Sequence, residues 1–110
     1  MKLLLAVDGS DNSYEAVRAL KYLARAEELH LVHVLDVPSP AYPMMIPEVA
    51  QELYETVERN MRDDGTRLLD RIGALLPLDA GAVTKHLGVG APVDQIVALA
   101  EQLKVGLILL

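Results

Sequence analysis

The stretch LLLAVDGSDNS, residues Leu3 to Ser13, joins a short apolar run to an acidic, hydroxyl-rich turn. A continuously apolar run that ends at a glycine-containing turn is typical of a strand buried on both faces. A helical pattern begins directly after the turn, because apolar residues recur there at every third or fourth position. This order predicts the first half of a βαβ unit. In open parallel sheets, ligands bind at such turns, at the carboxyl ends of the strands.

The same alternation of apolar runs and helical patterns continues along the chain. The expected strands are 2–7, 29–35, 82–87 and 105–110, and the expected helices are one from residue 11, then 48–76 and 93–103. Between them, residues 38–47 contain four prolines and predict a long loop with an apolar tip at Met44, Met45 and Ile46. Strands that alternate with helices form a parallel sheet with helices on both faces. We therefore expect the α/β class and a single domain over residues 1–110.

The composition excludes several function classes. The net charge of −6 disfavours sequence-independent binding to nucleic acid and to anionic membrane surfaces. The chain has no cysteine, so disulfides and thiolate metal sites are excluded. Its apolar runs are far shorter than the roughly 20 residues of a membrane span, and the N-terminus lacks a secretory signal. We expect a soluble, cytoplasmic protein.

Asp8 is the first candidate for a binding residue, because its carboxylate follows the first strand and can face the crevice above the sheet. Two interpretations stay open. The turn can simply end the strand and cap the helix through Ser10 or Asn12, or Asp8 can accept hydrogen bonds from a ribose or a base. A turn with one glycine and two carboxylates is a poor phosphate cradle. The phosphates of a nucleotide would therefore lie elsewhere, or next to a bound cation.

The three histidines do not predict a metal site. His30 and His33 are three residues apart on a strand, so their side chains point to opposite faces of the sheet. His33 is expected to be a hydrogen-bonded histidine of the sheet, and His86 stands alone in the sequence. We expect no metal and no catalytic residue. The segment GVGAP, residues 88–92, predicts a sharp turn after the third strand that uses Gly88 and Gly90.

Three stretches together resemble the universal stress protein family: KLLLAVDGSDNSYEAVRAL, LHLVHVLDVP and LGVGAPVDQIVALAEQLKVGLILL. The resemblance covers essentially all 110 residues. The VDGS turn, the HV pair before the long loop and the run G-x-P-x-x-x-I-x-x-x-A are specific in combination.

The resemblance implies a Rossmann-like open sheet of the adenine-nucleotide-binding kind, in strand order 3-2-1-4-5, and a homodimer. It implies a stress-response or signalling domain that binds ATP, accompanied by Mg²⁺, or another adenine nucleotide. Asp8 matches the family's acidic residue beside the ribose and adenine, and Val34 matches the position whose backbone meets the adenine edge. The other candidate binding residues are Ala6, Val7, Gly88 and Leu110, which would border the pocket, and Ser10 in the turn.

The family's glycine-rich phosphate signature follows the fourth strand, about where this sequence ends at Leu110. We therefore expect the order 3-2-1-4 here, with the fifth strand missing, and a natural protein that continues further. Two alternative functions stay open. One is a non-nucleotide interaction module that acts through its dimer surface and the apolar loop, and the other is a nucleotide-using enzyme domain of the same adenine-binding group. Slow ATP hydrolysis is the most catalysis that we expect.

Overall fold

The computed structural model describes residues 2–23, 28–37, 46–76 and 83–109. Strands and helices alternate in the order β1 (Lys2–Ala6), α1 (Asp11–Leu23), β2 (Glu28–Leu35), α2 (Pro47–Leu75), β3 (Val83–Val89), α3 (Pro92–Leu103) and β4 (Leu107–Leu109). The expected α/β class is confirmed. The loop predicted at 38–47 lies almost wholly outside the described residues.

The four described strands form one parallel sheet in the order β3-β2-β1-β4. β1 pairs with β2 from Lys2↔Glu28 to Ala6↔Val32, and β2 pairs with β3 from Leu29↔Val83 to Leu35↔Val89. Since every pair is parallel, the carboxyl ends of the strands meet at one edge of the sheet. That the fifth strand is missing stays a prediction.

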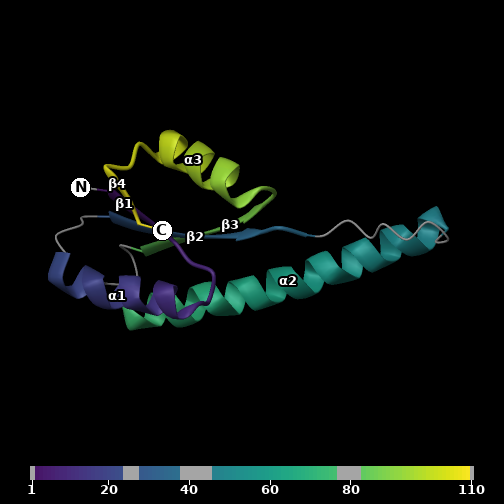
Figure 1. The fold of residues 1–110 in the computed structure, drawn as a ribbon, viewed down its shortest axis with the longest axis horizontal. Helices are drawn as coiled ribbons and strands as arrows, with labels where there is room; N and C mark the ends of the chain where they lie inside the picture. The colour runs from purple at the N-terminus through teal and green to yellow at the C-terminus, as the bar shows by residue number, and fades with distance from the viewer. Residues whose placement is uncertain (1, 24–27, 38–45, 77–82, 110) are drawn as a thin grey trace.

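Helices cover both faces of the sheet (Figure 1). α1 and α2 pack on one face around a core made by Leu3, Leu5, Val7, Val17, Leu29, Leu31, Leu68, Leu69, Ile72 and Leu76. α3 packs on the other face, where the buried residues are Leu4, Val32 and Ala100. Alternate residues of each strand face the two layers, as the period of two along a strand requires.

The first half of α2 extends beyond the carboxyl ends of the strands (Figure 1), and the molecule measures 54 × 25 × 23 Å. The helical stripe predicted to be buried is therefore exposed there: Val49 is 45% exposed and Leu53 is 38% exposed. Only the second half of the helix lies over the sheet, and its buried residues start at Gly65. Helical periodicity predicts which face of a helix is apolar, and it carries no information about where the sheet below it ends.

The turn after β3 differs from the one predicted. Gly88 belongs to the strand and pairs with Val34, so it makes no turn. Gly90 makes the turn alone, with φ +135°, and its N–H donates to the carbonyl of Leu35 at 3.0 Å. Pro92 then begins α3, as predicted for the first turn of a helix.

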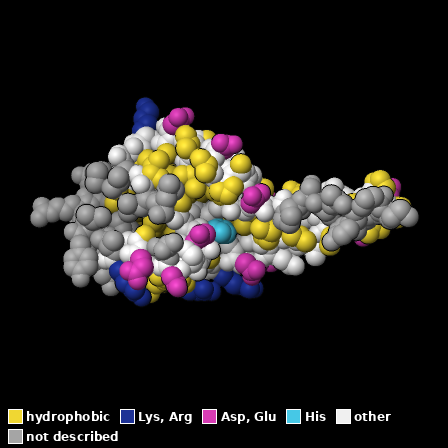
Figure 2. All heavy atoms as spheres, viewed as in Figure 1, with side chains coloured by type: hydrophobic (Ala, Val, Ile, Leu, Met, Phe, Trp, Pro, Cys, Tyr) yellow, Lys and Arg dark blue, Asp and Glu magenta, His cyan; other side chains and the backbone are white. Residues whose placement is uncertain are grey.

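Val97 of α3 is 46% exposed, although it belongs to the apolar pattern of this helix. Val93 on the same side of the helix is 72% exposed. Figure 2 shows hydrophobic side chains gathered on the surface over this helix. Ile96, Leu99 and Ala100 are the residues of α3 that pack on the sheet.

Candidate functional site

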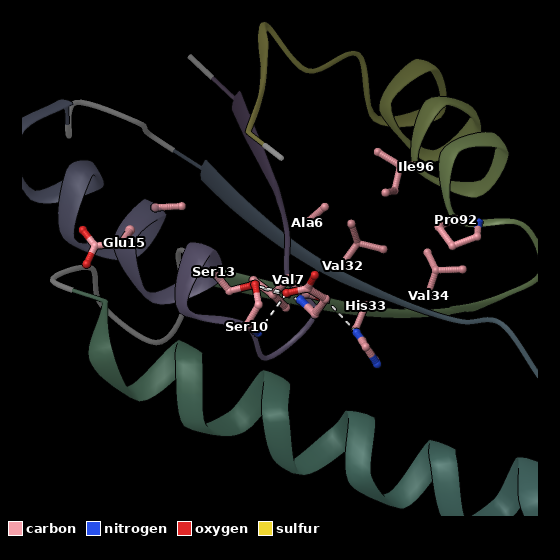
Figure 3. A pocket seen from close by; sticks show the side chains of 12 residues that line it. Ala6, Val7, Ser10, Ser13, Glu15, Val32, His33, Val34, Pro92 and Ile96 are labelled. Atoms are coloured by element: carbon pink, nitrogen blue, oxygen red, sulfur yellow. Dashed lines mark hydrogen bonds between the residues drawn. The ribbon is translucent and has the colours of Figure 1, made fainter.

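A crevice of about 790 Å³ opens where β1 and β2 end at the carboxyl edge of the sheet. The start of α1 borders it on one side and the start of α3 on the other (Figure 3). Its polar lining residues are Asp8, Ser10, Ser13, Glu15 and His33. Its apolar lining residues include Ala6, Val7, Val32, Val34, Pro92 and Ile96. The crevice therefore lies where open parallel sheets bind their ligands.

The turn between β1 and α1 holds the carboxylate of Asp8 in one position. Oδ1 of Asp8 accepts a hydrogen bond from the N–H of Ser10 at 2.9 Å and another from the hydroxyl of Ser13 at 2.8 Å. The N–H of Asp8 donates to the Ser13 hydroxyl oxygen at 3.0 Å. Gly9 has φ +81°, a left-handed conformation that glycine adopts without strain. Oδ2 of Asp8 takes part in none of these three bonds.

The pKa of Asp8 lies below that of an ordinary aspartate. The hydroxyl and the N–H of Ser10, followed by the hydroxyl of Ser13, lower this pKa from 3.8 to about 2. These groups act as donors that favour the charged form of the carboxyl group. Asp8 is exposed in the crevice. It therefore presents a fixed negative charge at neutral pH.

The electrostatics of the crevice favour donors over anions. Glu15 adds a second carboxylate to the lining, and no Lys or Arg lines the crevice within the described part of the chain. Arg18 pairs with the carboxylate of Glu15, so Asp8 is the carboxylate of the lining that repels a phosphate and attracts hydroxyl or amino groups.

Ala6, Val34 and Ile96 form an apolar wall of the crevice. All three are half-buried and pack against the core on the α3 face of the sheet. In Figure 3, Ile96 and Pro92 extend from α3 toward Val34, while Ser10 and Ser13 lie on the α1 side. An apolar wall next to a fixed acceptor suits a flat, uncharged ring system that carries hydroxyl groups.

A model of the universal stress protein family matches residues 1–110. This chain belongs to the universal stress protein family. The hypothetical protein MJ0577, a solved structure, is 27% identical with a TM-score of 0.78, over 99% of this chain and 72% of that one.

Two further solved structures share the fold. The universal stress protein UspA from Lactobacillus plantarum is 24% identical with a TM-score of 0.57, over 98% of this chain and 74% of that one. A universal stress protein in complex with cAMP is 24% identical with a TM-score of 0.56, over 98% of this chain and 69% of that one. No curated protein matches this chain significantly.

Five of the binding residues predicted for this universal stress protein line the crevice: Ala6, Val7, Asp8, Ser10 and Val34. Their role in binding stays a prediction. Gly88 does not line the crevice. Leu110 lies outside the described residues.

Seven lining residues were not predicted as site residues: Ser13, Glu15, Ala16, Val32, His33, Pro92 and Ile96. The sequence assigns Ser13 to helix capping, His33 to the sheet and Ile96 to the core. Ser13 is only 5% exposed because it turns back to Asp8. The sequence signal for it is a hydroxyl residue in the first turn of α1, five residues after the aspartate that follows a strand.

The histidines lie on both faces of the sheet. Nδ1 of His33 lies 2.7 Å from the carbonyl oxygen of Val7, which confirms the expected hydrogen-bonded histidine. On the opposite face, Nδ1 of His30 lies 2.8 Å from Nε2 of His86. The prediction that His86 stands alone is wrong, because the β2–β3 register brings it next to His30 across the strands. Burial, followed by the charge of His30, lowers the pKa of His86.

The described residues contain no group of three or more His, Asp or Glu side chains arranged to hold a metal ion. None of the helices in the described ranges is both long and apolar enough to cross a membrane.

Proposed function

We propose that this universal stress protein domain binds the nucleoside part of an adenine nucleotide, with Asp8 accepting hydrogen bonds from the ribose hydroxyls. The fixed carboxylate of Asp8 is the observation that carries the proposal. A pKa of about 2 keeps it charged, and Oδ2 takes part in none of the three bonds described above. A hydrogen bond from a ligand hydroxyl to such a charged acceptor contributes about 1.5–3 kcal/mol.

The adenine ring would lie against the wall of Ala6, Val34 and Ile96. These side chains offer apolar surface without a charge, which suits a flat aromatic ring. The cAMP complex of a universal stress protein supports this ligand class through the shared fold, since cAMP contains adenosine.

The phosphates would lie away from Asp8, because its carboxylate repels anions. ATP would therefore enter with Mg²⁺, which binds phosphates together with one or two carboxylates. The Mg²⁺ would offset the negative charge of the phosphates near the acidic lining of the crevice. We assign no catalytic residue, and the homodimer that the family resemblance implies remains part of this proposal.

Calorimetric titration with adenosine and with 2′,3′-dideoxyadenosine tests the role of Asp8. The wild-type domain should bind adenosine roughly 10- to 100-fold more tightly than the dideoxy compound, as expected for a hydrogen bond to a charged group. The Asp8→Asn variant keeps the carbonyl acceptor for Ser10 and Ser13 but loses the charge. It should bind both compounds with similar, weak affinity.

The matched control is Asp11→Asn, which removes the same charge from an exposed residue in the first turn of α1. It should preserve the preference for adenosine. If the wild-type domain does not bind adenosine, the proposal is wrong, and the interaction-module alternative then leads. If Asp8→Asn retains the full preference, the assignment of Asp8 is wrong.

A further inference from the structure

His33 connects helix α2 to the turn that carries Asp8. It is half-buried on β2, and Figure 3 shows its ring pointing from the strand toward α2. A Cβ built on Gly65 of α2 would lie only 2.9 Å from Cδ2 of His33, so the helix backbone lies directly against the ring. On its other side, the ring contacts the carbonyl of Val7, the residue before Asp8.

The hydrogen bond at 2.7 Å defines the tautomer of His33. A carbonyl oxygen can only accept, so Nδ1 of His33 must carry the hydrogen that it donates to Val7. The N–H of Val7 donates to the carbonyl of Val32 at 2.9 Å. The peptide groups on both sides of the Val7 Cα are therefore held by β2, one through its backbone and one through a side chain.

This side-chain contact replaces the next rung of the β1–β2 ladder. The paired residues of β1 and β2 end at Ala6↔Val32. In a continued parallel ladder, the carbonyl of Val7 would accept from the N–H of Val34. Here the carbonyl of Val7 accepts a hydrogen bond from His33 instead. The backbone of Val34 therefore faces the side of β2 where β1 has ended, and Val34 lines the crevice.

We propose that His33 is a positioning residue of the nucleoside site, which holds the Val7 carbonyl so that the carboxylate of Asp8 faces the ribose. This inference rests on the proposed function, and it adds a residue from the opposite face of β2. The chain of contacts runs from Gly65 through the His33 ring and the Val7 carbonyl to Asp8. The site is thereby linked to the packing of α2 on the sheet.

Two substitutions separate this role from a purely structural one. In His33→Asn, the amide nitrogen is attached to Cγ as Nδ1 is in histidine, so it can still donate to Val7. In His33→Leu, the donor is lost while apolar volume is kept. His33→Asn should retain adenosine affinity to within about threefold, and His33→Leu should lose roughly three- to tenfold, as expected for one neutral hydrogen bond.

His33→Leu should weaken only the part of adenosine binding that depends on the ribose hydroxyls. Its affinity for 2′,3′-dideoxyadenosine should equal that of the wild-type domain, while thermal unfolding shows a midpoint no lower than the wild-type one. ¹⁵N NMR of the wild-type domain should show a protonated Nδ1 at His33, independently of any ligand.

The outcomes distinguish the two proposals. If the wild-type domain and Asp8→Asn differ as expected but His33→Leu binds adenosine with full affinity, the role of His33 is overturned and the nucleoside site stands. Equal losses in His33→Asn and His33→Leu also overturn it, since the hydrogen bond would then be irrelevant. A wild-type domain that does not bind adenosine overturns both proposals.

Discussion

The two faces of the sheet are built from alternate residues of the same strands, yet they differ in how completely they are covered. Under α1 and α2 lies a continuous aliphatic core that includes most of the largest fully buried side chains, Leu5 and Ile72 among them. Under α3 the buried set is small, and it is surrounded by half-buried residues such as Val34 and Ile96. The crevice opens on this less covered side and reaches the other face through His33.

The difference separates two tasks within one small domain. A closely packed layer supplies most of the stability and holds β1 and β2 in position. A layer that leaves apolar residues half-exposed at the carboxyl edge of the sheet provides a surface that a ligand can still cover. The Asp8 turn lies between the two, anchored by Ser13 and by the peptide of Val7.

The largest expected effect is a loss of stability when one buried leucine is replaced by alanine on each face of the sheet. Leu4 and Leu5 are neighbours on β1, both are fully buried, and they face opposite layers. Leu5→Ala should lower the free energy of unfolding by about 4 kcal/mol, and Leu4→Ala by about 2.5 kcal/mol, because a loosely packed site can collapse around the cavity. Urea denaturation of both variants measures the difference. Equal losses, or a larger loss in Leu4→Ala, would show that the two faces are packed alike.

A smaller effect is expected from two glycines of α2. A Cβ at Gly65 would lie 2.9 Å from both His33 Cδ2 and Leu87 Cδ1, whereas a Cβ at Gly73 would meet Cε of Lys85, near the end of a flexible side chain, at 3.0 Å. Replacement of glycine by alanine inside a helix contributes up to about 1 kcal/mol of stability. Overpacking at a rigid contact costs about 1–3 kcal/mol.

Gly65→Ala should therefore destabilise the domain by about 1 kcal/mol net, and Gly73→Ala should leave it unchanged or slightly more stable. Thermal and urea unfolding of the two variants provide the comparison. Because Gly65 contacts His33, Gly65→Ala should also weaken adenosine binding, and Gly73→Ala should not. A stabilised Gly65→Ala would mean that α2 can move away from the sheet at no cost.

Much of the fold could be predicted from the sequence, because apolar residues recur with a different period in strands and in helices. The VDGS turn marks the first change from one period to the other. Asp8 could be predicted as a site residue for the same reason: it directly follows a buried strand of a parallel sheet. The exposure of Val49 and Leu53 could not be predicted, since it depends on how far the sheet extends under α2. A glycine in the middle of a helix lowers the stability of that helix, and only the structure gives Gly65 a packing role.

The histidines also show which contacts cannot be predicted from the sequence alone. The alternation along β2 predicts correctly that His30 and His33 point to opposite faces. The partner of His30 depends on the register between β2 and β3, and that register cannot be deduced from the sequence of either strand alone. His86 could therefore be identified as a neighbour of His30 only in the folded sheet.

The smallest expected effect concerns this histidine pair on the α3 face. The pKa of His86 is lower in the folded domain than its ordinary value of 6.5, because burial and the charge of His30 disfavour the protonated form. The unfolded chain then binds the proton more readily than the folded one. The stability should be fully present above pH 6.5 and should decrease as the pH falls through and below that value.

Urea unfolding between pH 7.5 and pH 5 measures this dependence without interference from Asp8, whose contribution is lost only as the pH falls from 3.8 toward 2. His86→Gln is the informative variant, because its amide nitrogen can reach the position of Nε2 and keep the contact with His30, and it does not titrate in this range. The variant should lose less stability than the wild-type domain between pH 7.5 and pH 5. The effect should be smaller than that of Gly65→Ala, since His86 is half-exposed and solvent screens its charge. If the stability of His86→Gln depends on pH as steeply as that of the wild-type domain, His86 is not the group that titrates between pH 7.5 and pH 5.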